Sequence, residues 1–329
     1  MKALFLINAN EQEKEEIRER IDERVEVFFR DELTEDERKK ILQEVDIVLG
    51  GRLSKEELES TNKLKFHQTF GTGVDRHNLK IYKEKNIILC NSHEHSDTIA
   101  EYAFSLLLAA SKELLANDKL LREKGLWDYT QYPSVSLTNK TILFLGFGHI
   151  GKKVMEYCKP FDMKFIAIKR RKNAEMQNVT VYTPEKRIEA IKQADFIINS
   201  LPLTEETRNF LGKEEFNAMK KEAIIVNVGR GKTIDEEELY LSLKNKKIKG
   251  AAIDVWYNYP KRRGEKQEPV PCYPSKYPFQ ELDNIIMSAH RAWQTDKKWH
   301  DRVIKLVENI NRFVRGEEPL NKVNLDMGY

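Results

Sequence analysis

Cysteine, long apolar runs and an excess of one charge are all scarce in this chain, and each scarcity excludes a class of protein. Only three cysteines occur in 329 residues, widely spaced and without a Cys-x-x-Cys pair, which predicts reduced thiols without a disulfide framework. No apolar run approaches the ~18 residues that span a bilayer. The 56 basic and 53 acidic side chains leave a net charge of +3, so the basic field of a nucleic-acid-binding protein is missing.

The first apolar run and the length of the chain predict where the protein works and how it is divided. The run at residues 3–7 is too short for a signal-peptide core and has no small-residue cleavage site nearby, so it is typical of a first strand. Together with the cysteines, this predicts a cytoplasmic protein. Single cores stop growing at about 250–300 residues, so a chain of 329 residues predicts two domains.

Short apolar runs alternate with charged helical stretches along most of the chain, which predicts parallel sheets covered by helices. In the first series the predicted strands are 3–7, 25–29, 47–49, 64–69 and 87–90, and the predicted helices are 11–22, 34–45 and 54–60. In the second series the predicted strands are 141–145, 165–168, 179–182, 196–199, 224–228, 251–253 and 285–288. Further helices are predicted over 97–116, crossing between the domains, and over 297–315, and an aperiodic loop over 257–277. The fold class is therefore α/β, with doubly wound parallel sheets.

A glycine-rich turn follows the predicted strand 141–145 and precedes an amphipathic helical stretch. At such a strand-to-helix turn a dinucleotide places its pyrophosphate, because the helix N-terminus offers N–H groups and partial positive charge. Gly146 suits the tight turn, Gly148 the approach of the ligand, and Gly151 the close packing of helix and strand. Together with His149 and Ile150, these glycines are the predicted cofactor contacts of the turn: Gly146, Gly148, His149, Ile150 and Gly151.

Three segments at the carboxyl ends of later strands carry a family resemblance. They read Asn-Val-Gly-Arg-Gly at 227–231, Gly-Ala-Ala-Ile-Asp-Val-Trp at 250–256 and Ser-Ala-His-Arg-Ala at 288–292. Phe-Gly-Thr-Gly-Val-Asp at 70–75 and Leu-Pro-Leu-Thr at 201–204 add to them. In order and spacing, over nearly its whole length, the chain resembles the D-isomer-specific 2-hydroxyacid dehydrogenases. The resemblance implies a Rossmann dinucleotide domain at 98–293 and a smaller flavodoxin-like substrate domain formed by 1–97 and 294–329.

The resemblance also implies hydride transfer between a nicotinamide cofactor and a small 2-oxo or 2-hydroxy acid, in the cleft between the domains. Ketone reduction needs a cation that holds the carboxylate and polarises the carbonyl, and an acid that protonates the oxygen. Arg230 and His290 suit these roles, because a guanidinium binds a carboxylate through two bonds and an imidazole titrates near neutrality. Backbone N–H groups of Thr72 and Gly73 would hold the other carboxylate oxygen. Trp293 is expected to line the pocket or to pack between domains.

Further cofactor contacts follow from the resemblance at six positions, with Asp254 beside the nicotinamide carboxamide: Leu201, Pro202, Thr207, Val228, Gly229 and Asp254. Where an NAD-specific enzyme places an acid for the ribose hydroxyls, this chain has Lys169, Arg170 and Arg171. Cations would pair with a 2′-phosphate that an acid would repel. The sequence therefore favours NADP(H), with NAD(H) as a usable second cofactor.

One departure from the family pattern concerns the partner of His290. The Glu that is usual five residues after the matching Asp is replaced by Tyr259, and Glu268 lies farther along the loop. Tyr259, Glu268 or a solvent group is left as the partner. Without a carboxylate the imidazolium is less stabilised, so reduction should weaken at lower pH than in carboxylate-paired members. His93 and His95 lack the rest of a ligand set, and no metal is expected.

Substrate and assembly are the least specified features. Glyoxylate and hydroxypyruvate are the first substrate candidates, since the resemblance is generic. A formate- or phosphite-type dehydrogenase of the same fold stays open, as does a non-catalytic dinucleotide sensor or corepressor. The retained Arg230 and His290 argue against a sensor. The resemblance further implies a homodimer, and neither a nucleic acid nor a membrane is an expected partner.

Overall fold

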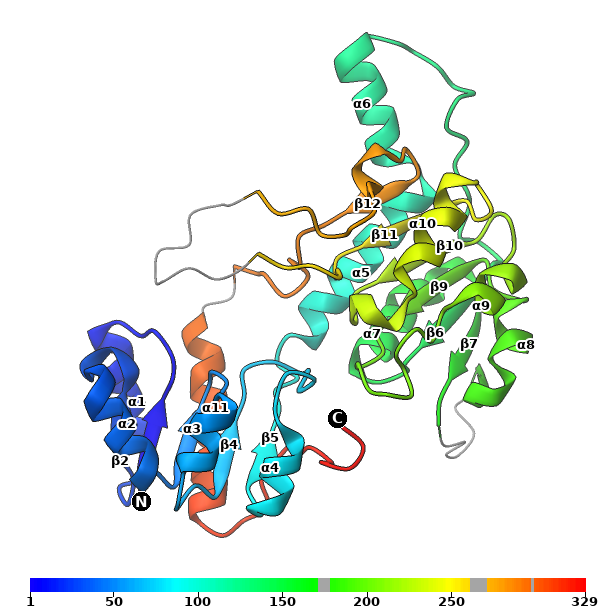
Figure 1. Cartoon of the computed structure of the whole chain (residues 1–329). Coiled ribbons are helices and arrows are strands. Elements are labelled where there is room, and N and C mark those ends of the chain that lie inside the picture. Colours follow the sequence, from blue (N-terminus) through cyan, green and yellow to red (C-terminus); the bar gives the residue numbers. More distant parts are fainter. Residues whose placement is uncertain (171–177, 261–270, 297–298) are drawn as a thin grey trace. The chain divides into compact units, whose positions relative to one another are not determined.

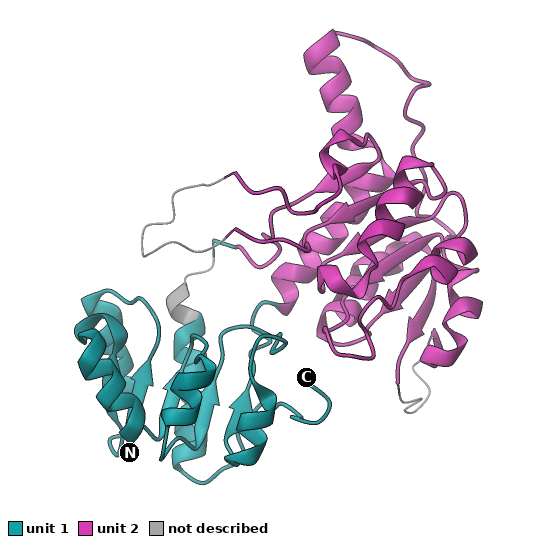
Figure 2. Cartoon of the chain, in the orientation of Figure 1, with its two compact units in different colours: residues 1–95, 295–329 teal, residues 96–294 magenta. Residues whose placement is uncertain are grey.

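The computed structural model of the protein describes residues 1–170, 178–260, 271–296 and 299–329, which form two compact units (Figures 1 and 2). Unit 1 comprises Met1–His95 and Thr295–Tyr329, and unit 2 comprises Ser96–Gln294. Unit 2 is therefore inserted into the chain of unit 1. The crossings predicted from the sequence, after residues 97 and 293, lie within two residues of these bounds.

Unit 1 is built on a five-stranded parallel sheet with the order β2-β1-β3-β4-β5, the flavodoxin-like doubly wound topology. Its strands are β1 (Lys2–Phe5), β2 (Glu26–Phe29), β3 (Ile47–Leu49), β4 (Phe66–Gln68) and β5 (Ile88–Cys90). Its helices are α1 (Glu11–Arg20), α2 (Glu35–Glu44), α3 (Lys55–Ser60), α4 (Leu79–Glu84), α11 (Trp299–Val314) and the short 3-10 helix η1 (Arg30–Glu32). Helices α1 and α11 contribute to the apolar cluster on one face of the sheet, and α2, α3 and α4 to the cluster on the other.

Three helices of unit 1 begin with the same hydrogen-bonding device. Asn10, Thr34 and Ser54 each accept a hydrogen bond from the N–H of the glutamate three residues later, whose carboxylate accepts from the N–H of the capping residue. This capping box satisfies N–H groups that have no partner within the helix. The sequence thus sets where α1, α2 and α3 start.

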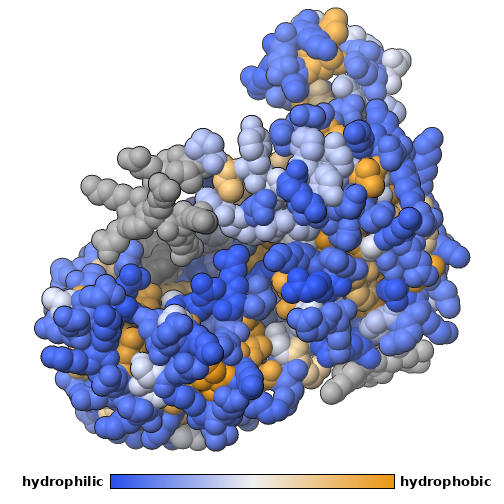
Figure 3. Space-filling model, in the orientation of Figure 1, coloured by the Kyte–Doolittle hydropathy of each residue, from blue (hydrophilic) through white to orange (hydrophobic). Residues whose placement is uncertain are grey.

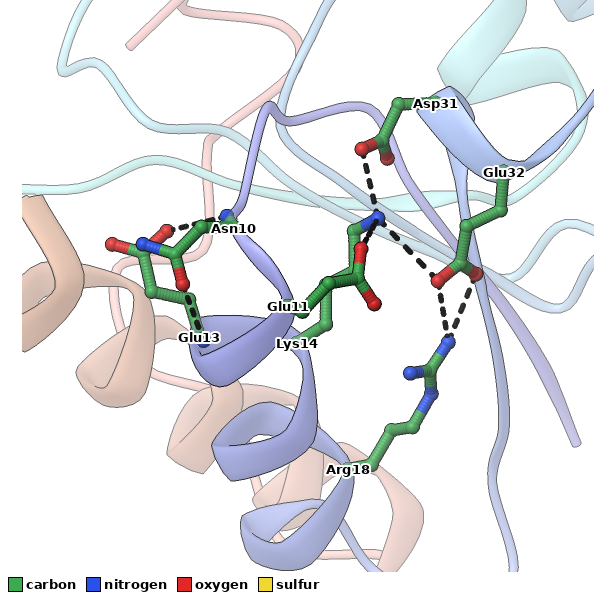
Figure 4. Close-up of polar contacts among 7 residues, drawn as sticks. All are labelled: Asn10, Glu11, Glu13, Lys14, Arg18, Asp31 and Glu32. Atoms are coloured by element: carbon green, nitrogen blue, oxygen red, sulfur yellow. Dashed lines mark hydrogen bonds and ion pairs between the residues drawn. The ribbon is translucent and has the colours of Figure 1, made fainter.

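A buried lysine joins α1 to the segment that follows the edge strand β2 (Figure 4). The ammonium of Lys14 lies 2.8 Å from Asp31, 2.9 Å from Glu11 and 3.5 Å from Glu32. Arg18 donates to both carboxylate oxygens of Glu32, at 2.8 and 2.9 Å. The hydrogen bond with Asp31 raises the pKa of Lys14, so the ammonium stays charged although its side chain is only 3% exposed. The network fixes the end of β2 against α1.

The other edge of this sheet is covered by the C-terminal segment. Lys322 forms an antiparallel bridge with Cys90 at the end of β5. On either side of it, the N–H of Asn91 donates to the carbonyl of Asn321 at 3.1 Å, and the N–H of Val323 donates to that of Leu89 at 2.8 Å. A strand edge offers unpaired backbone groups, and here the chain itself pairs with them.

Unit 2 is built on a seven-stranded parallel sheet with the order β12-β11-β10-β9-β6-β7-β8. Its strands are β6 (Thr141–Leu145), β7 (Lys164–Ile168), β8 (Val179–Tyr182), β9 (Phe196–Asn199), β10 (Ile224–Asn227), β11 (Gly250–Ile253) and β12 (Ile285–Met287). Helices α5 (Ser96–Ser111) and α7 (His149–Cys158) cover one face, and α8 (Arg187–Ile191), α9 (Lys213–Ala218) and α10 (Glu236–Lys244) the other. The strand order reverses between β6 and β9, which is the switch point of a Rossmann sheet. The two parallel sheets confirm the predicted fold class.

The predicted helix over 97–116 is wrong at its C-terminal end. Helix α5 stops at Ser111, and a separate helix, α6 (Leu114–Lys124), follows Glu113, which has a left-handed backbone at φ 52°. The carbonyl of Ser111 accepts a hydrogen bond from the N–H of Val135 at 2.7 Å, so a returning segment takes the carbonyl that a continuous helix would use. Helix α6 extends away from the sheet of unit 2 (Figure 1). Among all described residues, no helix combines the length and apolarity needed to cross a membrane.

Candidate functional site

The predicted dinucleotide residues lie on loops that follow the carboxyl ends of the strands of unit 2. Because these strands are all parallel, their carboxyl ends share one edge of the sheet. The loop after β6 carries the glycines, and the loop after β7 carries Lys169 and Arg170. The loops after β9 and β10 carry Leu201 and Arg230, and those after β11 and β12 carry Asp254 and His290. The structure therefore brings most of the predicted residues to one edge.

The three glycines of the turn between β6 and α7 have different surroundings. Gly146 adopts φ 80°, which favours glycine. A Cβ on Gly151 would lie 2.9 Å from the carbonyl oxygen of Gly146, so the helix packs against the turn too closely for any side chain. A Cβ on Gly148 would meet nothing within 4 Å, and this glycine is exposed at the start of α7 beside His149 and the partly buried Ile150. That open space at a helix N-terminus fits a dinucleotide pyrophosphate.

The loop after β9 packs against the turn after β10. A Cβ on Gly229 would lie 2.7 Å from the carbonyl oxygen of Leu201, a contact that only glycine permits. The N–H groups of Val228 and Gly229 both donate to the carbonyl of Asn199, at 3.0 and 3.1 Å. In the same loop the hydroxyl of Thr207 donates to the carbonyl of Pro202 at 2.7 Å. The hydroxyl of Thr207 therefore closes its own turn, and its predicted cofactor contact stays a prediction.

The cations after β7 have an acidic neighbour that the sequence analysis missed. The backbone N–H of Lys169 donates to the carbonyl of Tyr182, which continues the pairing of β7 with β8. The guanidinium of Arg170 lies 3.3 Å from the carboxylate of Glu206, which is on the loop after β9. Arg171 lies outside the described residues. A 2′-phosphate bound here would compete with Glu206 for Arg170.

Arg230 stands on a turn that side chains hold from both sides. The amide of Asn227 donates to the carbonyl of Arg230 at 3.1 Å and accepts from the N–H of Gly229 at 3.1 Å. The hydroxyl of Thr233 donates to the same carbonyl at 2.7 Å. The partly buried guanidinium donates to the carbonyl of Gly229 at 2.8 Å. Asn227 was not predicted as a site residue, although it opens the matched segment 227–231.

Asp254 is buried, and its carboxylate accepts hydrogen bonds from the loop after β12. The donors are the hydroxyl of Ser288 at 2.5 Å and the N–H groups of Arg291 at 2.8 Å and Ala292 at 3.0 Å. The backbone carbonyl of Asp254 accepts from the N–H of His290 at 2.8 Å. Asp254 thus holds the backbone on both sides of His290. Its predicted place beside the nicotinamide carboxamide stays a prediction.

The loop that carries His290 is fixed by further contacts that the sequence did not indicate. The hydroxyls of Tyr102, on α5, and Ser288 lie 2.7 Å apart. The indole N–H of Trp256 donates to the carbonyl of Ser288 at 2.7 Å. With Asp254, these residues anchor the start of the loop to α5 and to the end of β11.

His290 adopts a left-handed backbone at φ 54°, a conformation that costs free energy and persists only where the surroundings impose it. Tyr259 lies beside it, with ring centroids 5.5 Å apart in an edge-to-face arrangement. The hydroxyl oxygen of Tyr259 accepts a hydrogen bond from the N–H of Trp256 at 3.1 Å. The structure therefore brings the residue at the usual Glu position to the imidazole. Glu268, the other candidate partner, lies outside the described residues, as do residues 261–270 of the predicted loop.

The remaining predicted residues lie in unit 1 or at the surface. Thr72 and Gly73 follow β4 and are partly buried, and the hydroxyl of Thr72 donates to the carbonyl of Ser92 at 2.8 Å. Trp293 is 43% exposed. Its place in the substrate pocket stays a prediction.

The histidines at 93 and 95 have no metal-binding surroundings in the described part of the chain. No group of three or more His, Cys, Asp or Glu side chains is placed there to hold a metal ion. Burial, aided by the charge of Arg302, lowers the pKa of His95 to about 4. Glu94, between the two histidines, forms an ion pair with Lys305 at 2.5 Å.

Comparison with known proteins shows which proteins the chain is similar to. A family model described as D-isomer specific 2-hydroxyacid dehydrogenase, NAD binding domain, matches residues 104–292. The chain is 31% identical over 288 residues to a glyoxylate reductase from Korarchaeum cryptofilum, covering 85% of this chain and 82% of that protein. It is 33% identical over 298 residues to a D-3-phosphoglycerate dehydrogenase from Methanocaldococcus jannaschii, covering 89% of this chain and 54% of that protein. The chain thus spans about half the length of the second relative.

Among solved structures, a similar fold is found in an acyclic imino acid reductase (Bsp5) in complex with NADPH and D-Arg. The TM-score is 0.80 at 26% sequence identity, and the match covers 98% of this chain and 100% of the other. The similarity therefore extends over both units and is not confined to the dinucleotide domain.

Proposed function

The chain belongs to the D-isomer-specific 2-hydroxyacid dehydrogenase family, and from this premise we propose that it transfers a hydride between NADP(H) and a small 2-oxo or D-2-hydroxy acid. The observation that carries the proposal is the edge of unit 2, where the glycine turn, Arg230 and His290 follow parallel strands of one sheet. Glyoxylate and hydroxypyruvate are the first substrates to test, because glyoxylate reductases are among the relatives.

In this proposal Arg230 and His290 divide the work on the substrate. The guanidinium of Arg230 binds the carboxylate and polarises the carbonyl, while its backbone is held by Asn227. His290 donates a proton to the carbonyl oxygen during reduction and accepts it in the reverse direction. The bound nicotinamide supplies or accepts the hydride. Thr72 and Gly73 are proposed as further donors to the carboxylate.

The preference for NADP(H) is proposed from Lys169 and Arg170, which follow β7 where a 2′-phosphate would need cations. The acyclic imino acid reductase of similar fold was solved with NADPH, which supports this choice. Glu206 opposes it, because it already pairs with Arg170. A usable affinity for NAD(H) is therefore part of the proposal.

The test is the loss of 340 nm absorbance with NADPH and, separately, NADH against glyoxylate, hydroxypyruvate and a 2-imino acid. We expect turnover, with a lower KM for NADPH. Equal KM values for the two cofactors would refute the assignment of Lys169 and Arg170. The matched variant is His290→Ala, which should abolish turnover and keep cofactor binding. Cofactor binding without turnover of any acid would instead favour a formate- or phosphite-type dehydrogenase or a sensor, and formate and phosphite oxidation then separate these.

We also propose a homodimer that forms through unit 2. Helix α6 and the segment after it expose large apolar side chains, and apolar surface is visible on the projecting α6 (Figure 3). The most exposed are Leu114 at 61%, Trp127 at 77% and Tyr129 at 89%. A contiguous exposed apolar patch typically marks an interface. Sedimentation equilibrium should show a dimer that Trp127→Asp weakens, and a monomer at every protein concentration would refute it.

A further inference from the structure

In the turn of Gly71, Thr72 and Gly73 in unit 1, the first two backbone carbonyls accept hydrogen bonds from other residues of unit 1. The carbonyl of Gly71 accepts from the N–H of Ser92 at 3.1 Å and from the hydroxyl of Thr69 at 2.9 Å. The carbonyl of Thr72 accepts from the side-chain amide of Asn91 at 2.9 Å. Two consecutive peptide carbonyls are therefore directed at the segment that follows β5.

Peptide geometry then fixes the direction of the N–H groups. In a trans peptide the C=O and the N–H of one unit point in opposite directions. The carbonyl of Gly71 shares its peptide with the N–H of Thr72, and that of Thr72 shares its peptide with the N–H of Gly73. Both N–H groups are thus turned away from the segment after β5, and neither donates to an oxygen among the described residues. Successive outward N–H groups form a concavity that binds an anion.

Asn91 is buried in a way that fold stability alone does not explain. Its side chain is 6% exposed, and while its Nδ2 binds Thr72, its Oδ1 has no partner among the described residues. If the amide were turned the other way, Oδ1 would face the carbonyl oxygen of Thr72, and two acceptors cannot form a hydrogen bond. The atom of Asn91 that faces Thr72 is therefore Nδ2. Burying a half-satisfied amide costs free energy, and an apolar residue of similar size would avoid that cost.

We propose that Asn91 is a positioning residue for the substrate, because its amide turns the peptide of Thr72 and Gly73 so that their N–H groups face the substrate carboxylate. The inference rests on the proposed function for the identity of the anion. Asn91 does not touch the substrate, and it acts through the carbonyl of Thr72. The variant that removes it should therefore weaken binding of a 2-oxo acid and leave cofactor binding unchanged.

The experiment compares Asn91→Ala with Asn311→Ala, measuring KM for glyoxylate, kcat, the Kd of NADPH and the Kd of oxamate in the NADPH complex. Asn311 is a matched control, because it is also a buried amide of unit 1, and among the described residues its side chain bonds Arg20 and Asp22. For Asn91→Ala we expect KM and the oxamate Kd to rise about tenfold, as for one lost buried hydrogen bond. For Asn311→Ala we expect stability to fall while both constants stay within about twofold.

A milder variant keeps the test decisive if Asn91→Ala does not fold. Thr69→Val removes one of the two donors to the carbonyl of Gly71 and should raise the oxamate Kd about threefold. The inference is overturned if neither variant affects oxamate binding more than Asn311→Ala does, if NADPH binding weakens in parallel, or if the wild type binds no oxamate. Oxamate binding without turnover would instead contradict the proposed function, and the oxamate constants would still test Asn91.

Discussion

Replacing Asp254 with asparagine separates two roles for this carboxylate, anchoring the His290 loop and contacting the cofactor. An asparagine keeps one oxygen for Ser288 and Arg291, but it presents an NH2 group to the N–H of Ala292. A buried N–H that loses its charged acceptor costs about 2 kcal/mol. For a unit of this size we expect Tm to fall by about 4–8 °C. The loosened loop should lower kcat about 100-fold, since a displacement of about 1 Å has that effect.

The assay combines calorimetry, kcat for glyoxylate reduction and the Kd of NADPH from fluorescence. The matched control is Asp235→Asn in unit 2, because Asp235 caps α10 by accepting from the N–H of Glu238 at 3.0 Å. The control should keep its kcat and lose little stability, because asparagine caps a helix about as well as aspartate. A variant Asp254→Asn with normal Tm and kcat but weaker NADPH binding would refute the reasoning, and it would show that the carboxylate serves the cofactor, as the family resemblance implies.

Three further predictions concern charge. Tyr259→Glu places a carboxylate beside His290, which raises the pKa of the imidazole, so the alkaline fall of the reduction rate should move to higher pH; an unchanged pH profile would exclude the idea. Glu206→Gln removes the ion pair with Arg170, which is worth less than about 1 kcal/mol. KM for NADPH should therefore fall about two- to fivefold while KM for NADH stays constant. Equal changes in both KM values would contradict this prediction. Burial, reinforced by the neighbouring His77, lowers the pKa of His67 from 6.5 to about 3, so the unfolded state takes up the proton first and stability falls below pH 6.5, by about 2 kcal/mol at pH 5. Calorimetry from pH 7.5 to 5 should show a shallower decline of Tm for His67→Phe than for the wild type, and parallel curves would rule this out.

Much of the fold could be predicted because buried parallel strands appear in the sequence as short continuous apolar runs. The predicted strands 47–49, 141–145 and 196–199 coincide with β3, β6 and β9. Helix α4 was missed, since six residues are too few to show a helical period. The end of α5 was missed for another reason. It depends on a hydrogen bond from Val135, 24 residues farther along the chain than Ser111, and no local signal marks it.

The candidate site likewise has a part that the sequence could predict and a part that it could not. The glycine turn could be predicted because its requirements are local, namely a positive φ at Gly146 and close packing at Gly151. The anchoring of the His290 loop could not, because the donors to Asp254 come from the loop after a neighbouring strand and their register is set by the pairing of β11 with β12. The same holds for the link from Asn91 to Thr72.

The division of unit 1 into two chain segments determines when it can be completed during synthesis. The strands of unit 1 leave the ribosome first, but part of the apolar cover on one face of its sheet comes from α11: Val303, Leu306, Val307 and Ile310. All of unit 2 is translated in between, which takes roughly 10–40 s for about 200 residues. The continuous unit 2 can therefore fold on the nascent chain, while the N-terminal segment of unit 1 waits with part of an apolar face exposed. During that interval the nascent chain is most open to chaperones and to aggregation, and the arrival of α11 ends it.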